Sequence, residues 1–281
     1  MRGSEFKEND FFTRHSVKPK GDDLESQDYD GISEQGVELA KQRAQEILAG
    51  LDEAEGGSVL FLGGASEMNR TKSTALVYGH EIKQILSEQN RQDVVVFMPE
   101  DVKDLQGYSK KVEYLIDQIK ANPDKKFILD FPMFLKNFGI YGERWRDEND
   151  QPLPYLKKLL YVAGNNEESA MSEWFKDQGK IDNLIGPNPK EIAEEQLVGI
   201  KRLREFAEKY LQDRPLIIGS VGHSWNLDAV AVYLANNGEV DFDSFENMRA
   251  RMIKETGMIR LEKKDDKPVL CYGDLEIPLE K

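Results

Sequence analysis

The chain has 281 residues, 39% of them hydrophobic and 32% charged, which is typical of a soluble globular protein with a core in one large domain or two small ones. Its net charge of −14 repels phosphate backbones and argues against general nucleic-acid binding, so any anion site must be a local concentration of positive groups. The single cysteine, Cys271, excludes an intramolecular disulfide and fits a reducing, cytoplasmic compartment. No apolar run in the sequence approaches the roughly 20 residues that a helix needs to cross a membrane.

The N-terminal part begins with a short apolar run that ends in Thr13-Arg14-His15-Ser16. The polar, Asp-rich stretch over residues 18–31 predicts a loop. Ser33 follows it and is suited to be a helix N-cap, because its hydroxyl can accept a hydrogen bond from a free N–H of the first turn. Apolar residues then recur at helical spacing, which predicts an amphipathic helix over residues 34–50.

Strand and helix patterns alternate in the next part of the chain. SVLFLGG predicts a buried strand, ASEMNRTKSTALVYGHEIKQIL a helix, and DVVVFMPED a second buried strand that Pro99 ends. This alternation indicates an α/β protein, specifically a three-layer α/β/α sandwich with a mostly parallel central sheet.

The pattern is less regular from residue 108 to about residue 188. YSKKVEYLIDQIKA predicts a helix, KKFILDF a strand or a buried helix, and NFGIYGERWRDENDQPLP a loop. We expect these residues to form a mainly helical insertion, or cap, on a single domain that spans residues 7–281. Regularity returns with a long helix that has Pro189 near its start, the strand PLIIGSVGH, the helix NLDAVAVYLANNG and two closing strands about a charged turn.

Positively charged side chains follow several of the predicted strands. Arg14 and His15 end the first apolar run. Arg70 lies after SVLFLGG where a helix begins, and His223 directly follows PLIIGSVG. Because the carboxyl ends of parallel strands meet at one edge of an open sheet, where ligands bind, we expect these groups to converge there. Glu100 follows DVVVFMP and belongs to the same edge.

Four segments resemble, in order, the motifs of one known family. They are TRHS, GISEQG before a helix, ASEMNRTKSTA, and GHS after a strand. The histidine phosphatase superfamily, which is phosphoglycerate-mutase-like, shows R-H-G, an L-T-x-x-G helix start, S-x-x-x-R-x-x-x-T-A and a late G-H. The resemblance spans the chain except for the middle insertion, and the closing strand pair is also similar.

The resemblance implies a metal-independent phosphatase that needs no cofactor. His15 would be the nucleophile that forms a phosphohistidine, and neighbouring positive charge would favour its neutral imidazole. Arg14 and Arg70 would bind the phosphoryl oxygens through forked, charge-assisted hydrogen bonds. His223 would complete the substrate-binding pocket and stabilise charge as the phosphoryl group transfers.

The resemblance also implies a proton donor to the leaving oxygen, an acidic residue just after the strand that follows the arginine segment. Glu100 occupies that place, and Asp101 beside it is the rival. Ser16 stands where the family usually has glycine, a residue that tolerates an unusual φ or a close backbone approach. Arg144 and Arg146 could select a substrate anion but are expected to be surface charge, and His80 a surface or packing histidine.

Phosphoglycerate-mutase-type phosphotransfer is the main alternative to hydrolysis. Mutases of the family carry E-R-H-Y-G-G-L-Q-G after the acid, whereas this chain has PEDVKDLQG and lacks that arginine and tyrosine. We therefore favour hydrolysis of a small phosphorylated metabolite or a phosphoprotein. Non-catalytic binding of a phosphorylated ligand is a third possibility, although a pure binder does not require the nucleophile.

Overall fold

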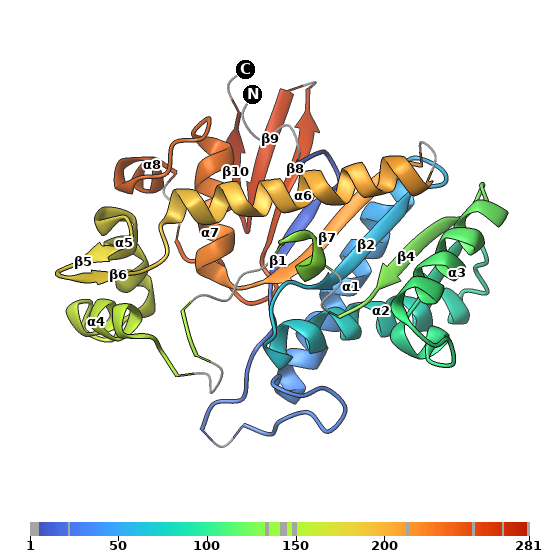
Figure 1. Cartoon of the computed structure of the whole chain (residues 1–281), viewed down its shortest axis with the longest axis horizontal. Helices are drawn as coiled ribbons and strands as arrows, with labels where there is room; N and C mark the ends of the chain where they lie inside the picture. The colour runs from blue at the N-terminus through green and yellow to red at the C-terminus, as the bar shows by residue number, and fades with distance from the viewer. Residues whose placement is uncertain are drawn as a thin grey trace.

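The computed structural model of the chain describes residues 6–21, 23–132, 135–140, 145–147, 151–211, 214–248, 251–265 and 267–279. Eight strands form its central sheet (Figure 1). They are β1 (Phe11–Arg14), β2 (Val59–Gly64), β3 (Val94–Phe97), β4 (Lys126–Asp130), β7 (Leu216–Gly222), β8 (Met258–Lys264), β9 (Lys267–Tyr272) and β10 (Leu275–Pro278). Their order across the sheet is β10-β9-β8-β1-β7-β2-β4-β3.

The sheet has a parallel part and an antiparallel edge. β1, β7, β2, β4 and β3 pair in parallel, which confirms the mostly parallel sheet predicted from the sequence. β8 pairs antiparallel with β1, and β9 and β10 continue the antiparallel edge. The predicted closing strand pair is therefore present as β8 and β9, with β10 as a third strand. KKFILDF, for which the sequence left two possibilities, is strand β4.

Helices cover both faces of the sheet. α1 (Glu34–Glu53) and α2 (Asn69–Glu88) lie on one face, and α3 (Tyr108–Ala121), α6 (Pro189–Leu211) and α7 (Ser224–Ala235) lie on the other (Figure 1). Alternate residues of β2 point to opposite cores: Leu60 and Leu62 pack with α1 and α2, whereas Phe61 packs with α6 and α7. The predicted three-layer sandwich is confirmed.

The start of α1 is packed tightly against the chain that follows β1. Ser33 is the N-cap, and its Oγ accepts a hydrogen bond from the Gly36 N–H at 3.1 Å. A Cβ atom on Gly36 would lie 2.5 Å from the carbonyl oxygen of Val17, so only glycine allows this approach. The Ser16 hydroxyl donates to the Gly36 carbonyl at 2.6 Å. These contacts hold the backbone directly after His15.

The segment between β4 and α6 begins with the 3-10 helix η2 (Leu135–Phe138), which contacts α6 and β2. The rest of it lies at the end of the molecule away from α3 (Figure 1), as α4 (Pro154–Val162), α5 (Glu167–Asp177) and a hairpin of β5 (Lys180–Ile181) and β6 (Leu184–Ile185). Two tryptophans of this segment contact Trp225 of α7: Trp145 edge to face, with ring centroids 4.8 Å apart, and Trp174 stacked, with centroids 5.7 Å apart. Two elements that fall within the predicted 108–188 insertion are part of the sandwich itself: β4 is a strand of the central sheet, and α3 covers one of its faces.

The last described helix, α8 (Phe242–Asn247), packs on α5 through stacked rings of Phe245 and Phe175, 4.5 Å apart.

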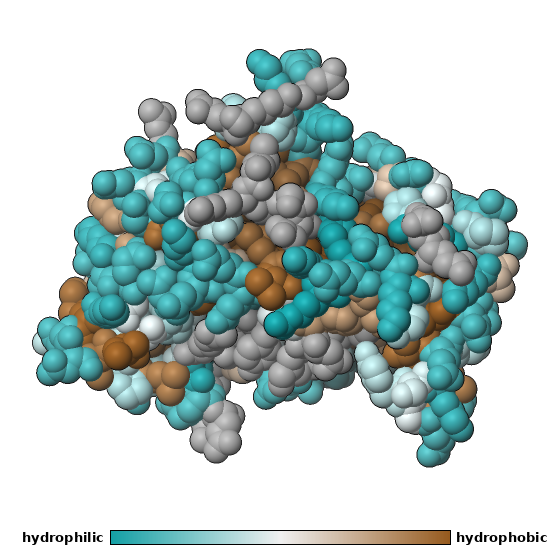
Figure 2. Space-filling view, turned by 45° about the horizontal axis from the view of Figure 1, so that its top comes forward, coloured by the Kyte–Doolittle hydropathy of each residue, from teal (hydrophilic) through white to brown (hydrophobic). Residues whose placement is uncertain are grey.

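No helix in the described part of the chain combines the length and the apolarity needed to span a membrane. The face of the molecule shown in Figure 2 is predominantly hydrophilic, with separate small hydrophobic patches.

Candidate functional site

A cavity of about 370 Å³ opens at the carboxyl ends of β1 and β7. Positive side chains from four separate segments line it, namely Arg14, Lys18, Lys20, Arg70, Arg146 and Lys254. His15 and His223 lie among them, and the lining carboxylates are Glu167 and Glu255. The cavity is therefore the local concentration of positive charge that an anion site requires in a chain with a net charge of −14.

The parallel pairing of β1 and β7 brings the two histidines together. Arg14 is in register with Gly222, and the His15 N–H donates to the Gly222 carbonyl at 2.9 Å. His223 is the next residue along the chain, so both imidazoles leave the sheet at adjacent strand ends. Their ring centroids are 5.2 Å apart, and both residues are buried.

His15 is held in one tautomer. Its Nδ1 lies 2.7 Å from the carbonyl oxygen of Ser16, which can only accept, so Nδ1 carries the proton and Nε2 keeps a free lone pair. Burial lowers the pKa of His15 well below its ordinary value, and the nearby charges of Arg70, Arg14 and Lys18 lower it further. The result is a neutral imidazole with Nε2 available as a nucleophile.

His223 is oriented from the loop that precedes α2. Its Nε2 lies 2.9 Å from Oγ of Ser66, and that hydroxyl also lies 2.9 Å from Oγ1 of Thr71. Burial lowers the pKa of His223 well below its ordinary value, and His15 and the cavity arginines, including Arg146, add to the effect. Ser66 is thus a residue of the site to which the sequence assigned no role.

The two arginines reach the cavity from different elements. Arg14 ends β1, and its Nη1 donates to the Ile253 carbonyl at 2.7 Å while Nη2 lies 3.2 Å from Glu255 Oε1. Arg70 is the second residue of α2. Gly31 has φ +78°, and a Cβ atom there would lie 2.9 Å from the Arg70 backbone nitrogen. Glycine at this position therefore lets the loop pack on the start of α2.

Four lining cations were missed or misjudged from the sequence. Arg146, expected to be surface charge, lines the cavity and lowers the pKa of His223; Arg144 lies outside the described residues. Lys18 and Lys20 follow His15 by three and five residues, a proximity that could have indicated them. Lys254 carries no such signal, because only the chain path after α8 brings it to the cavity.

The structure does not bring Glu100 to the cavity, which corrects the expected position of the acid. Glu100 Oε1 lies 3.0 Å from Nε2 of His80, whose Nδ1 lies 2.9 Å from the Tyr29 hydroxyl. Asp101 accepts hydrogen bonds from Lys83 Nζ and from the Met98 N–H, each at 2.8 Å. Glu100 does follow a strand at the expected edge, but β3 is three strands from β7, or about 14 Å at the usual strand spacing.

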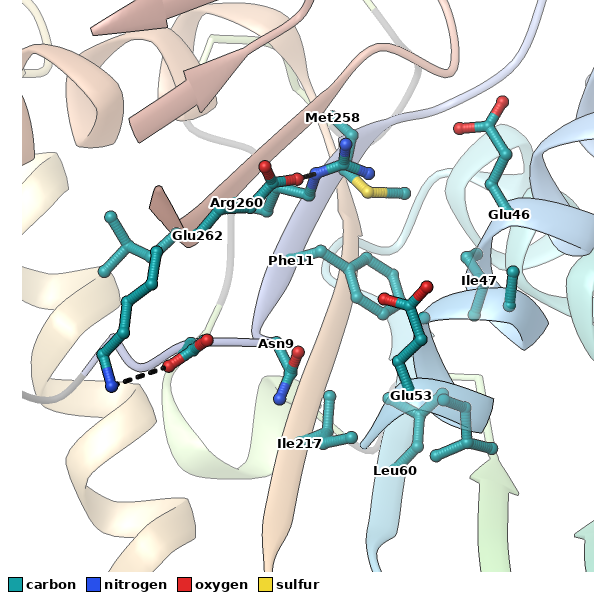
Figure 3. Close-up of a pocket in the computed structure, with 16 residues that line it drawn as sticks. Asn9, Phe11, Glu46, Ile47, Glu53, Leu60, Ile217, Met258, Arg260 and Glu262 are labelled. Carbon is teal, nitrogen blue, oxygen red and sulfur yellow. Dashed lines mark ion pairs between the residues drawn. The ribbon is translucent and has the colours of Figure 1, made fainter. Parts of the chain in front are cut away.

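Within the described ranges, no group of three or more His, Cys, Asp or Glu side chains is arranged to hold a metal ion. A larger cavity of about 520 Å³ lies near the amino ends of the parallel strands (Figure 3). Phe11, Leu60 and Ile217 line its floor. Carboxylates such as Glu46 and Glu53 surround it, and its Arg260 is paired with Glu262. No histidine is among the residues that line this larger cavity. The 370 Å³ cavity, with its two histidines and its arginines and lysines, is therefore better suited to bind an anion.

No family model and no curated protein matches the chain. It is similar to the solved structure of a mycobacterial glucosyl-3-phosphoglycerate phosphatase, at 13% identity and a TM-score of 0.47 over 95% of this chain and 98% of that one. It is also similar to the α-ribazole phosphatase from Shigella flexneri, at 13% identity and a TM-score of 0.40 over 96% and 98% of the two chains.

A third similar structure is a protein named mycobacterial hydrolase 2, at 10% identity and a TM-score of 0.46 over 98% of this chain and 92% of that one. Two of these three proteins are named as phosphatases.

Proposed function

We propose that the chain is a phosphomonoester hydrolase of the histidine phosphatase type and that His15 is its nucleophile. The observation that carries this proposal is the geometry of His15, a buried imidazole whose Nδ1–H is bound to the Ser16 carbonyl. Arg14, Arg70 and His223 line the same cavity. This combination suits a neutral nitrogen nucleophile that attacks a bound anion.

In the proposed reaction, Nε2 of His15 attacks phosphorus and the bond to the ester oxygen breaks. The leaving oxygen takes a proton from a carboxyl group, and the enzyme holds the phosphoryl group as a phosphohistidine. A water molecule then gives a proton back to that carboxylate as it attacks phosphorus, the N–P bond breaks, and inorganic phosphate and neutral His15 are formed. Arg14 and Arg70 bind the phosphoryl oxygens through charge-assisted hydrogen bonds, and His223 stabilises the transferring group.

We assign the proton donor to Glu255 in place of Glu100. Glu255 and Glu167 are the carboxylates that line the cavity in the described part of the chain. Glu255 contacts Arg14 at 3.2 Å, so it lies beside one of the groups that would hold the phosphoryl oxygens. Glu167 lies in the first turn of α5. A proton donor must be within hydrogen-bond reach of the reacting atoms, so we choose Glu255 of these lining carboxylates. We infer that the phosphoryl oxygens replace Glu255 on Arg14 when the substrate binds, which releases its carboxyl group from the ion pair to carry the proton.

The substrate is proposed to be a small phosphorylated metabolite or a phosphorylated protein segment. One wall of the cavity is apolar and consists of Trp145, Leu156, Leu160, Trp225 and Met252. Residues of the segment between β4 and α6 supply three of these side chains and also Arg146. We therefore propose that this segment is a cap that selects the organic part of the substrate.

The proposed function is tested by hydrolysis of p-nitrophenyl phosphate in excess chelator. We expect turnover that the chelator leaves unchanged, and an acid-labile, alkali-stable phosphoryl group on His15 when labelled substrate is quenched rapidly. Turnover that stops on chelation would contradict the mechanism. Binding of vanadate without any turnover would favour a non-catalytic phosphate-binding protein.

The acidic limb of the pH profile is expected below pH 6.5. Because burial and the arginines lower the pKa of His15, its imidazole stays neutral at pH values at which an ordinary histidine is protonated. Activity should therefore persist as the pH falls through 6.5 and disappear only at lower values. NMR titration of the His15 ring, with the resonance assigned by its loss in His15→Asn, measures this directly. A midpoint at or above pH 6.5 would show that Nε2 is not kept neutral.

A further inference from the structure

Arg14 is held by a strap that consists of residues 251–257. The Ile253 carbonyl accepts from Nη1 of Arg14 at 2.7 Å, and the Arg14 backbone pairs with Thr256 N and Gly257 O at 3.1 and 3.0 Å. Glu255 makes the ion pair with Nη2. The position of the guanidinium therefore depends on the conformation of this strap.

The strap is packed at Ile253 and lies between two cavities at the residues beside it. Ile253 is 3% exposed and belongs to the hydrophobic core. Met252, Lys254 and Glu255 line the 370 Å³ cavity of the candidate site and also a second cavity of about 660 Å³, to which Tyr272 of β9 contributes. Because these neighbours have open space on both sides, the orientation of the Ile253 peptide unit depends on its hydrogen bonds as well as on the packing of its side chain.

Those hydrogen bonds come from two buried side chains that the proposed reaction does not use. Asp228 of α7 is 1% exposed and Tyr272 is 3% exposed. Asp228 Oδ1 accepts from the Tyr272 hydroxyl and from the Ile253 N–H, the latter at 3.3 Å. The Tyr272 hydroxyl also lies 2.6 Å from the carbonyl oxygen of Arg251, and its single hydrogen is shared between these two acceptors. The pair thus binds the strap at residues 251 and 253.

We propose that Asp228 and Tyr272 are positioning residues that act through the strap to aim the guanidinium of Arg14 at the phosphoryl group. The peptide unit of Ile253 is the direct link, since the N–H of Ile253 binds Asp228 and its carbonyl binds Arg14. This inference rests on the proposed function for the identity of the bound anion. Neither Asp228 nor Tyr272 lines the candidate site.

Asp228 is a buried carboxyl group with only one of its two oxygens hydrogen-bonded in the described part of the chain. Burial raises the pKa of Asp228 to about 7, although the bonds from Tyr272 and Ile253 and the charge of Arg14 lower it. Its Oδ2 is buried and has no hydrogen-bond partner in the described part of the chain. A buried carboxyl oxygen without a hydrogen bond lowers the stability of the fold. We therefore infer that Asp228 serves through the hydrogen bonds of its other oxygen, Oδ1.

The test measures the affinity of the full chain for inorganic phosphate by calorimetry, well below the melting temperature. Tyr272→Phe removes one oxygen and is expected to weaken phosphate binding about tenfold, the effect of losing one positioning hydrogen bond. Tyr78→Phe is the matched control, because Tyr78 is a buried tyrosine whose hydroxyl contacts Thr13 of the same strand as Arg14 at 3.3 Å. Its phosphate affinity should be unchanged.

Two further variants separate positioning from a purely structural role. Asp228→Asn keeps an acceptor at Oδ1 and should retain most of the affinity, whereas Asp228→Leu should lose about as much as Tyr272→Phe. In an Arg14→Gln background, Tyr272→Phe should have no additional effect, because no guanidinium remains to be aimed. An unchanged affinity in Tyr272→Phe, or an equal loss in the Arg14→Gln background, would overturn the inference. A wild type that binds no phosphate would instead overturn the proposed function, and this inference with it.

Discussion

Replacement of His15 by asparagine is expected to abolish phosphatase activity, with a loss of at least about 10⁴-fold in kcat. The asparagine amide can still donate to the Ser16 carbonyl that binds Nδ1 of His15, so the local backbone should be preserved. What is lost is the lone pair on Nε2, without which no phosphohistidine forms. Arg14, Arg70 and His223 remain in place, and phosphate or vanadate should therefore still bind.

His80→Asn is the control for this experiment. His80 is half-exposed and contacts Glu100 and Tyr29, and it does not line the cavity. Its replacement should leave kcat unchanged. If His15→Asn retains substantial activity after the protein has been purified away from host phosphatases, another residue must be the nucleophile and the proposed mechanism is wrong.

Replacement of Arg204 by leucine is expected to lower the free energy of unfolding by about 3–5 kcal/mol, the usual result of removing one partner of a buried ion pair. Asp10 is fully buried, and its Oδ2 is paired with Nη2 of Arg204 while its Oδ1 accepts from the Ile218 N–H at 2.9 Å. Without Arg204 the carboxylate of Asp10 would be buried without a compensating charge. Chemical denaturation at pH 8 measures the loss.

The loss in Arg204→Leu should become smaller at low pH. Burial raises the pKa of Asp10 to about 6 against the lowering effect of Arg204, and removal of the arginine raises it further. A raised pKa in the folded state favours folding at low pH, and that contribution is lost as the pH rises through the folded-state value. The variant should therefore be closer to the wild type at pH 5 than at pH 8.

Two controls define the origin of this effect. Adding Asp10→Asn to Arg204→Leu removes the buried charge but keeps an acceptor for Ile218, and should restore much of the stability. Lys41→Ala breaks an exposed ion pair with Glu38 and should cost less than about 1 kcal/mol. Equal losses of unfolding free energy in Lys41→Ala and Arg204→Leu would show that the buried Asp10–Arg204 pair matters no more for stability than an exposed ion pair.

The α/β layers and the two histidines of the candidate site could be predicted from local patterns in the sequence. Alternating apolar runs and helical spacing predicted β1, β2, β3 and β7 with their following helices, because the periods of strands and helices are local properties. The Ser33 cap was predicted for the same reason. Arg14, His15, Arg70 and His223 could be assigned to one edge because parallel strands end together, and the cavity includes all four.

Which other side chains reach that cavity depends on contacts between elements that are far apart in the sequence. Glu100 ends a strand at the correct edge, yet the order of strands places β4 and β2 between β3 and β7, and local patterns carry no information on that order. Lys254 and Glu255 reach the cavity from a strap whose path depends on hydrogen bonds to Asp228 and Tyr272, which are distant in sequence. Hydrophobic periodicity indicates which residues of a single helix or strand are buried. Which residues form a site depends on contacts between different helices, strands and loops.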